Sequence, residues 1–150
     1  MNNKLKPLEQ WYCDSCGKLI GNKEDGYLEW LHTSGEMGDQ HAYVITHNKR
    51  ACLYDQRTLF KEHNLSSSGT HIESFLGADG LLNLLADIED NMVRDNSEII
   101  EIIKRLHTPY YEEARTYVSE AEIDNEFDGM APVVRSFQST NIRLIERYSK

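Results

Sequence analysis

Residues 13–23 read CDSCGKLIGNK, and residues 47–52 read HNKRAC. Together the two stretches hold every cysteine of the chain and one histidine. Two cysteines separated by two residues can face one metal ion when the backbone turns tightly, and Gly17, directly after the pair, allows such a turn. Residues 48–50 are turn-tolerant or solvated, which suits a second turn. The spacing therefore predicts one metal site with four ligands: Cys13, Cys16, His47 and Cys52.

These ligand types favour structural zinc. Zinc in structural sites is held by four Cys or His ligands in a tetrahedron, and such a closed site has no position for a reacting water. We therefore expect a structural Zn²⁺ rather than a catalytic one. His41 stays open as an alternative to His47 for the fourth ligand, because alternation along a strand would place both histidines on one face. The short spacing to Cys52 favours His47.

Two other interpretations of the cysteines remain open. A redox-active pair of the thioredoxin type would lie between a strand and the start of a helix, whereas the turn-rich GKLIGNKEDG (17–26) follows the pair here. In the second interpretation, the three cysteines are free thiols that have no relation to one another. Residues 1–10, MNNKLKPLEQ, lack the apolar core of a signal peptide, so we expect a cytoplasmic protein. In that reducing compartment, thiolates on a metal are favoured over disulfides.

Over residues 11–54 the chain resembles the zinc-ribbon and zinc-knuckle group of folds, in which a CxxCG knuckle precedes a β-hairpin and a second knuckle. The resemblance implies a zinc-stabilised hairpin that binds protein or nucleic acid, since the group does both. The chain departs from the pattern in its gap of 30 residues between knuckles and in its second knuckle, His-x4-Cys. A later run, RLHTPYYEEAR (105–115), resembles a segment of small bacterial proteins and implies no activity.

The first third of the chain reads as strand and turn. GYLEWL (26–31) and HAYVITH (41–47) are rich in the aromatic and β-branched residues typical of strands, and the polar TSGEMGDQ (33–40) between them predicts a hairpin loop. A short helix or an irregular segment is expected within residues 51–63. SSSGT (66–70) is small and polar, which predicts a linker or loop.

Beyond the serines the hydrophobic period becomes helical. In residues 78–93 one stripe repeats at i, i+4, i+7 and i+11, and residues 95–107 repeat the pattern behind a capping box formed by Asp95 and Glu98. Further helices are expected from Pro109 and from near Pro132. The residues expected inside are Leu81, Leu85, Ile88, Met92, Ile99, Ile102, Ile103, Leu106, Val134, Phe137, Leu144, Ile145 and Tyr148.

The predicted fold class is therefore α+β. A small zinc-stabilised, zinc-ribbon-like β domain spans residues 1–65, and a three- to four-helix α domain spans residues 66–150. The net charge of −9 lies almost wholly in the second unit, which carries 8 Lys or Arg against 16 Asp or Glu, while the first carries 8 against 9. No stretch approaches the roughly 20 apolar residues of a membrane span, so no membrane partner is expected.

No catalytic constellation is found in the sequence. Motifs of zinc proteases, serine hydrolases and phosphate-binding loops do not occur. Glu112 and Glu113 are paired carboxylates, but beside Arg115 on a helix they read as solvated charges and local ion pairs. The sequence therefore predicts a protein that is not an enzyme.

Two classes of function remain. In the first, zinc holds the hairpin and the protein acts as an interaction or regulatory module through protein–protein contacts; the apolar content of the helices also fits a homodimer interface. In the second, the zinc-ribbon segment binds nucleic acid as a transcription-related regulator. The basic residues of that alternative are Lys18, Lys23, Lys49, Arg50 and Arg57. The acidic second half repels phosphate backbones and favours the protein partner.

Overall fold

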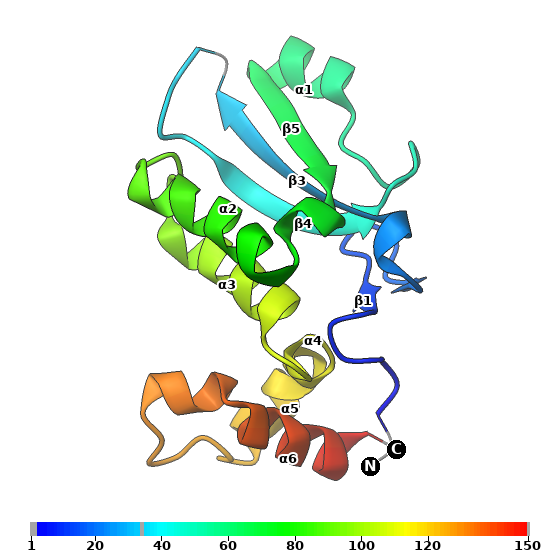
Figure 1. Ribbon diagram of the computed structural model, residues 1–150, viewed down its shortest axis with the longest axis vertical. Coiled ribbons are helices and arrows are strands. Elements are labelled where there is room, and N and C mark those ends of the chain that lie inside the picture. The colour runs from blue at the N-terminus through cyan, green and yellow to red at the C-terminus, as the bar shows by residue number, and fades with distance from the viewer. Residues whose placement is uncertain (1–2, 34, 150) are drawn as a thin grey trace.

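The computed structural model describes residues 3–33 and 35–149 and shows a mixed α/β fold with small antiparallel sheets (Figure 1). A three-stranded sheet lies in the upper part of Figure 1, α2 and α3 pack beside it, and α4, α5 and α6 form the lower end. The strands are β1 (Trp11–Tyr12), β2 (Leu19–Ile20), β3 (Gly26–Thr33), β4 (His41–His47) and β5 (Leu65–His71). The α-helices are α1 (Gln56–His63), α2 (Gly77–Glu89), α3 (Asn96–His107), α4 (Tyr111–Ala114), α5 (Val118–Ile123) and α6 (Gln138–Tyr148). Short 3-10 helices are η1 (Lys23–Asp25), η2 (Ile72–Phe75), η3 (Arg115–Tyr117) and η4 (Pro132–Ser136).

The predicted hairpin of β3 and β4 is present, with Leu28 opposite Ile45. Both residues are fully buried and belong to one core with Ile99 and Ile102 of α3. Burial of such side chains is the main favourable term in folding, at roughly 1.5–3 kcal/mol each. The hairpin is therefore held against the helices by large core residues of both its strands.

The serine-rich run 66–70 is a strand, so the predicted linker is wrong. It forms most of β5, which pairs antiparallel with β3 and makes β3 the central strand of the order β4-β3-β5. Gly69 explains part of this choice: a Cβ there would lie 2.4 Å from the carbonyl oxygen of Leu28, so only glycine fits. The division into units 1–65 and 66–150 stays a prediction, but its supposed linker belongs to the sheet.

The core-facing stripe of α2 differs from the predicted one. Leu84 is buried, with 1% of its surface exposed, whereas Leu81 and Leu85 are only half-buried. Gly80 lies one turn before Leu84 on the same face, and a Cβ there would overlap the backbone of Phe75. The leucines at four of five successive positions fit two helical stripes, and the close approach at Gly80 selects between them.

The stripe predicted for α3 is confirmed at its three buried positions, Ile99, Ile102 and Leu106. Asp95 caps the helix by accepting a hydrogen bond from the amide of Ser97 at 2.9 Å. The capping box is not closed, because Glu98 accepts instead from the amide of Ala42 at 2.8 Å and so ties the helix to β4.

The predicted third helix is broken into α4, η3 and α5. With α6 these segments enclose a second core, formed by Ala114, Tyr117, Ala121, Phe127, Leu144 and Ile145. Phe137, expected inside, precedes α6 and is 48% exposed. Within the described residues, no helix is both long enough and apolar enough to cross a membrane.

Candidate metal centre

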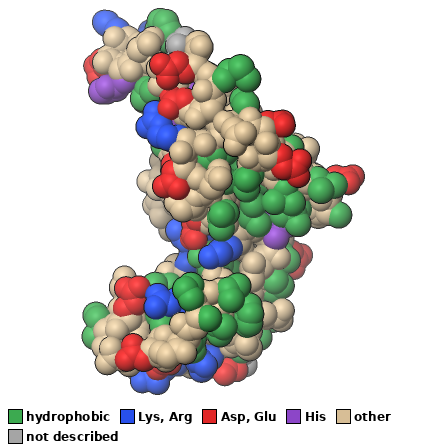
Figure 2. Space-filling model, turned by 90° about the vertical axis from the view of Figure 1, so that its left-hand side faces the viewer, with side chains coloured by type: hydrophobic (Ala, Val, Ile, Leu, Met, Phe, Trp, Pro, Cys, Tyr) green, Lys and Arg blue, Asp and Glu red, His purple; other side chains and the backbone are tan. Residues whose placement is uncertain are grey.

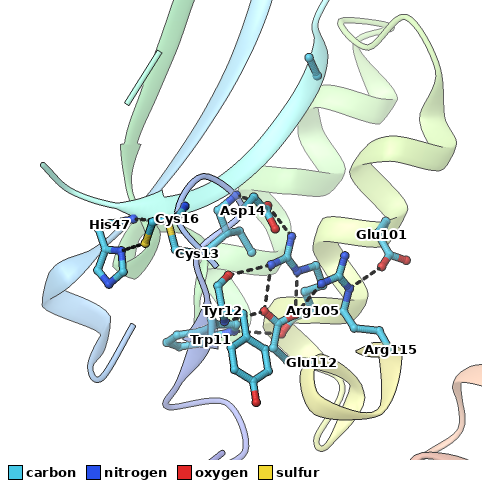
Figure 3. Close-up of polar contacts among 12 residues, drawn as sticks. Trp11, Tyr12, Cys13, Asp14, Cys16, His47, Glu101, Arg105, Glu112 and Arg115 are labelled. Carbon is cyan, nitrogen blue, oxygen red and sulfur yellow. Dashed lines mark hydrogen bonds and ion pairs between the residues drawn. The ribbon is translucent and has the colours of Figure 1, made fainter. Parts of the chain in front are cut away.

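The four predicted ligands come together at the end of the sheet. The Sγ atoms of the three cysteines and a ring nitrogen of His47 all lie within 4.8 Å of one another. The Nδ1 atom of His47 lies 3.4 Å from Sγ of Cys16 and 3.9 Å from Sγ of Cys52 (Figure 3 shows the first contact). Cys13 and Cys52 are buried, while Cys16 is exposed. Among the described residues, this is the one such group of Cys, His, Asp and Glu side chains.

The spacing of the ligand atoms fits a tetrahedral ion. With metal–sulfur distances of about 2.3 Å and metal–nitrogen distances of about 2.0 Å, ligand atoms around zinc lie about 3.5–3.8 Å apart. The two contacts of His47 Nδ1, at 3.4 and 3.9 Å, are close to that separation. Three thiols and one imidazole form a donor set that suits zinc. These residues can therefore hold a metal ion with little movement.

The first knuckle is shaped by backbone hydrogen bonds. The amide of Gly17 donates to the carbonyl oxygen of Cys13 at 2.9 Å, and Gly17 has φ of +76°, in the region that glycine tolerates best. The amides of Cys16 and His47 each donate to Sγ of Cys13 at 3.4 Å. Burial raises the pKa of the Cys13 thiol, but these amides outweigh burial and lower the pKa to about 6. The knuckle thus favours the thiolate, the form that binds metal.

A contact with β2 fixes the orientation of the His47 ring in the second knuckle. Nε2 lies 2.9 Å from the carbonyl oxygen of Leu19, so Nε2 carries the proton that this oxygen accepts. Nδ1 is then left with its lone pair toward the three sulfur atoms. Such a bond from the outer ring nitrogen is usual for histidine ligands of metals. The amide of Cys52 donates to the carbonyl oxygen of Lys49 at 2.9 Å and closes the turn.

His41, the alternative ligand, lies outside the cluster. Its Nδ1 is 2.7 Å from the carbonyl oxygen of Asp39. The alternation that would put both histidines on one face is interrupted, because the pairing of β3 with β4 shifts between Glu29 and Leu31 and Ala42 has φ of +54°. The geometry therefore favours His47 over His41.

A buried arginine links the first knuckle to the helices. Arg105 of α3 is 3% exposed, and its guanidinium bonds both carboxylate oxygens of Glu112, at 2.7 and 2.9 Å. It also donates to Asp14 at 2.7 Å and to the carbonyl oxygen of Tyr12 at 3.3 Å (Figure 3). Cys13 therefore lies between two residues that one guanidinium holds. Asp14 in turn accepts from the amide of Ile45 at 2.8 Å, which extends the connection to β4.

The expectation that Glu112 and Glu113 are solvated charges is wrong. They are 5% and 2% exposed. Glu112 does approach Arg115 at 3.8 Å, but its main partner is Arg105, and Glu113 accepts from the amides of Lys4 and Leu5 at 2.7 and 2.8 Å. The sequence feature that could have indicated the pairing of Arg105 with Glu112 is their spacing of seven residues on the two sides of a Thr-Pro break.

The arrangement can stabilise structure. Four ligands can close the coordination sphere of an ion, and the ion pairs of Arg105 with Asp14 and Glu112 hold the chain next to Cys13.

Comparisons of the chain with protein-family models, with curated proteins and with solved structures found no match.

Proposed function

We propose that this protein is a non-enzymatic, zinc-stabilised interaction protein that acts by binding another protein. The observation that carries the proposal is the meeting of three thiols and one imidazole within 4.8 Å. With all four bound, zinc has no free position for a substrate or water and serves to hold the chain. The zinc-ribbon resemblance supports the same interpretation.

The position of the ion explains what it would stabilise. The first knuckle follows β1 and the second follows β4, so zinc would join β-segments that are distant in the sequence. The link through Arg105 extends that effect to the helices. Since metal binding by such sites contributes directly to folding free energy, the ion would fix the relative position of the hairpin and the helical surface.

The helical part offers surfaces for a partner. Figure 2 shows hydrophobic side chains gathered in the middle of the molecule, on the side where α2 lies. Leu82 of α2 is 61% exposed and Ile100 of α3 is 42% exposed. The surplus of carboxylates in residues 66–150 favours association with basic proteins and opposes nucleic acid.

Metal analysis of protein purified without added zinc tests the site. We expect about one zinc per chain, lost on treatment with a strong chelator together with the near-ultraviolet circular dichroism of the aromatic core. Metal-free protein with a disulfide between Cys13 and Cys16 would contradict the proposal.

Binding assays separate the two classes of function. The alternative, a nucleic-acid-binding regulator, is favoured by Lys49 and Arg50, which are exposed at the tip of the second knuckle. A shift assay with DNA and RNA at physiological salt, run beside a pull-down from native lysate, compares them. Salt-sensitive nucleic-acid binding that Lys49→Glu and Arg50→Glu abolish, without a protein partner, would favour the alternative.

A further inference from the structure

A surface hollow of about 610 Å³ lies next to the candidate metal centre. It is lined by residues 48–50 and 53–57, which directly follow His47 and Cys52 in the chain. Two of the four proposed ligands therefore anchor the segments that form its walls. The volume is in the range of pockets that hold small molecules or a few side chains.

The hollow is cationic in an acidic protein. Lys49, Arg50 and Arg57 line it, and all three are exposed. Its carboxylate, Asp55, is already engaged as the cap of α1, where it accepts hydrogen bonds from the amide and the hydroxyl of Thr58 at 3.3 and 3.0 Å. The local charge is thus positive although the chain carries −9.

Within the described residues these cations form no close ion pair, and the only carboxylate that acts on one of them is Asp55, which interacts electrostatically with Arg57. Most arginines of the described chain hold at least one carboxylate, namely Arg94, Arg105, Arg115, Arg143 and Arg147. Within residues 3–33 and 35–149, no ion pair is formed by Lys49, Arg50 or Arg57. Two guanidiniums that line one hollow without a close ion pair can each take a carboxylate through two parallel hydrogen bonds.

We infer that this hollow binds an acidic segment of a partner protein, a short run of Asp or Glu side chains. The inference rests on the proposed function, since the zinc would fix the turns that carry Lys49 and Arg50. A nucleic acid fits less well for two reasons. The net charge of −9 opposes a long phosphate backbone, and the one aromatic residue in the lining, Tyr54, is half-buried with its hydroxyl bonded to the carbonyl oxygen of Ala42.

A fluorescent hexaglutamate peptide tests the inference by anisotropy on the full chain, whose zinc content is measured in the same preparation. We expect saturable binding whose affinity falls as salt is raised. The double variant Arg50→Gln, Arg57→Gln should bind the peptide at least tenfold more weakly than the wild type. The matched control is Arg135→Gln, because Arg135 is exposed, forms no carboxylate pair in the described chain and lies outside the hollow. This control should bind the peptide as the wild type does.

Three results would overturn the inference. The first is no peptide binding by zinc-loaded protein, and the second is equal binding by the double variant with its thermal unfolding unchanged. The third is a single-stranded RNA 20-mer that binds more tightly than the peptide and needs Arg50 and Arg57. Zinc content decides the proposed function separately: metal-free protein refutes that proposal, whereas zinc-loaded protein that ignores the peptide refutes only the binding of an acidic segment.

Discussion

The two ring nitrogens of His47 face different partners. Nε2 is bonded to the carbonyl oxygen of Leu19, and Nδ1 faces the thiols. The sequence could place His47 near Cys52 from spacing alone, because four intervening residues suffice for a turn. It could not exclude His41, because the shift in register at Glu29 and Leu31 that separates the two histidines has no signal in a local pattern.

Substitution of each histidine separates the two assignments. We expect that the His47→Ala protein loses its zinc when a weak chelator is added, whereas the wild type keeps it. The variant lacks one of four ligands, and water can reach the ion at the vacated position. His41→Ala should retain about one zinc per chain, since His41 bonds the carbonyl oxygen of Asp39 instead. Both zinc contents can be measured by mass spectrometry under native conditions. Loss of zinc in His41→Ala alone would reverse the assignment.

Asp39 provides a test of acid stability. It accepts hydrogen bonds from the amide of Thr33 at 2.9 Å and from Nε of Arg94 at 2.7 Å, and these bonds hold its pKa well below the usual range. A depressed folded-state pKa stabilises the fold above the unfolded-state value of about 3.9, and the effect is lost as pH falls through the folded value.

The variant Asp39→Asn should therefore be less stable than the wild type near neutral pH. The difference in unfolding free energy should shrink as pH falls below about 4, because the carboxylate of the unfolded wild type takes up a proton there while the folded one still carries its charge. Denaturant unfolding of both proteins at several pH values measures this. Because release of a bound metal would affect both proteins alike, a difference that stayed constant with pH would contradict the role assigned to the Asp39 carboxylate.

At the scale of elements, period alone predicted the α3 face but not the α2 face. In α3, two pairs of isoleucines and Leu106 are separated by charged side chains, so the apolar residues define one face of the helix. In α2, leucines occupy both candidate stripes, and the choice depends on backbone packing that composition does not show, the approach of Gly80 to the backbone of Phe75. Similarly, the run 66–70 has the composition of a loop, and its pairing with β3 supplies the backbone partners that composition could not indicate.

Alanine substitutions in α2 test the corrected face. Leu84→Ala should lower the unfolding free energy by about 2–5 kcal/mol, because it leaves a cavity in the main core. Leu85→Ala should cost at most about 1 kcal/mol, since the half-buried side chain exposes part of its surface already. Urea denaturation gives both values. Equal losses at the two positions would indicate that α2 is rotated from its described orientation.

At the scale of the molecule, the candidate metal centre and the helices are parts of one contact network. Trp11 is fully buried, and its ring nitrogen donates to the carbonyl oxygen of Arg105 at 3.1 Å. The guanidinium of Arg105 holds Tyr12 and Asp14. Long-range partners of this kind cannot be read from local sequence, which explains why Glu112 and Glu113 were expected to be solvated.

The isolated segment 1–65 should therefore fold poorly. It lacks β5 and Arg105, so β3 loses one paired strand and Trp11 loses its cover. We expect tryptophan emission at longer wavelength than in the full chain, and weaker zinc binding by competition with a chromophoric chelator. A fragment with full-chain zinc affinity and cooperative unfolding would instead establish residues 1–65 as an independent domain.

The distance along the chain between Asp14 and Arg105 also matters while the protein is being translated. The separation of 91 positions takes roughly 5–18 s to synthesise at about 5–20 residues per second. For that interval the nascent chain carries Cys13 and Cys16 outside the ribosome before their flanking residues have an arginine to bind. The first metal or oxidant to reach those thiols meets a peptide that has not yet acquired its final surroundings.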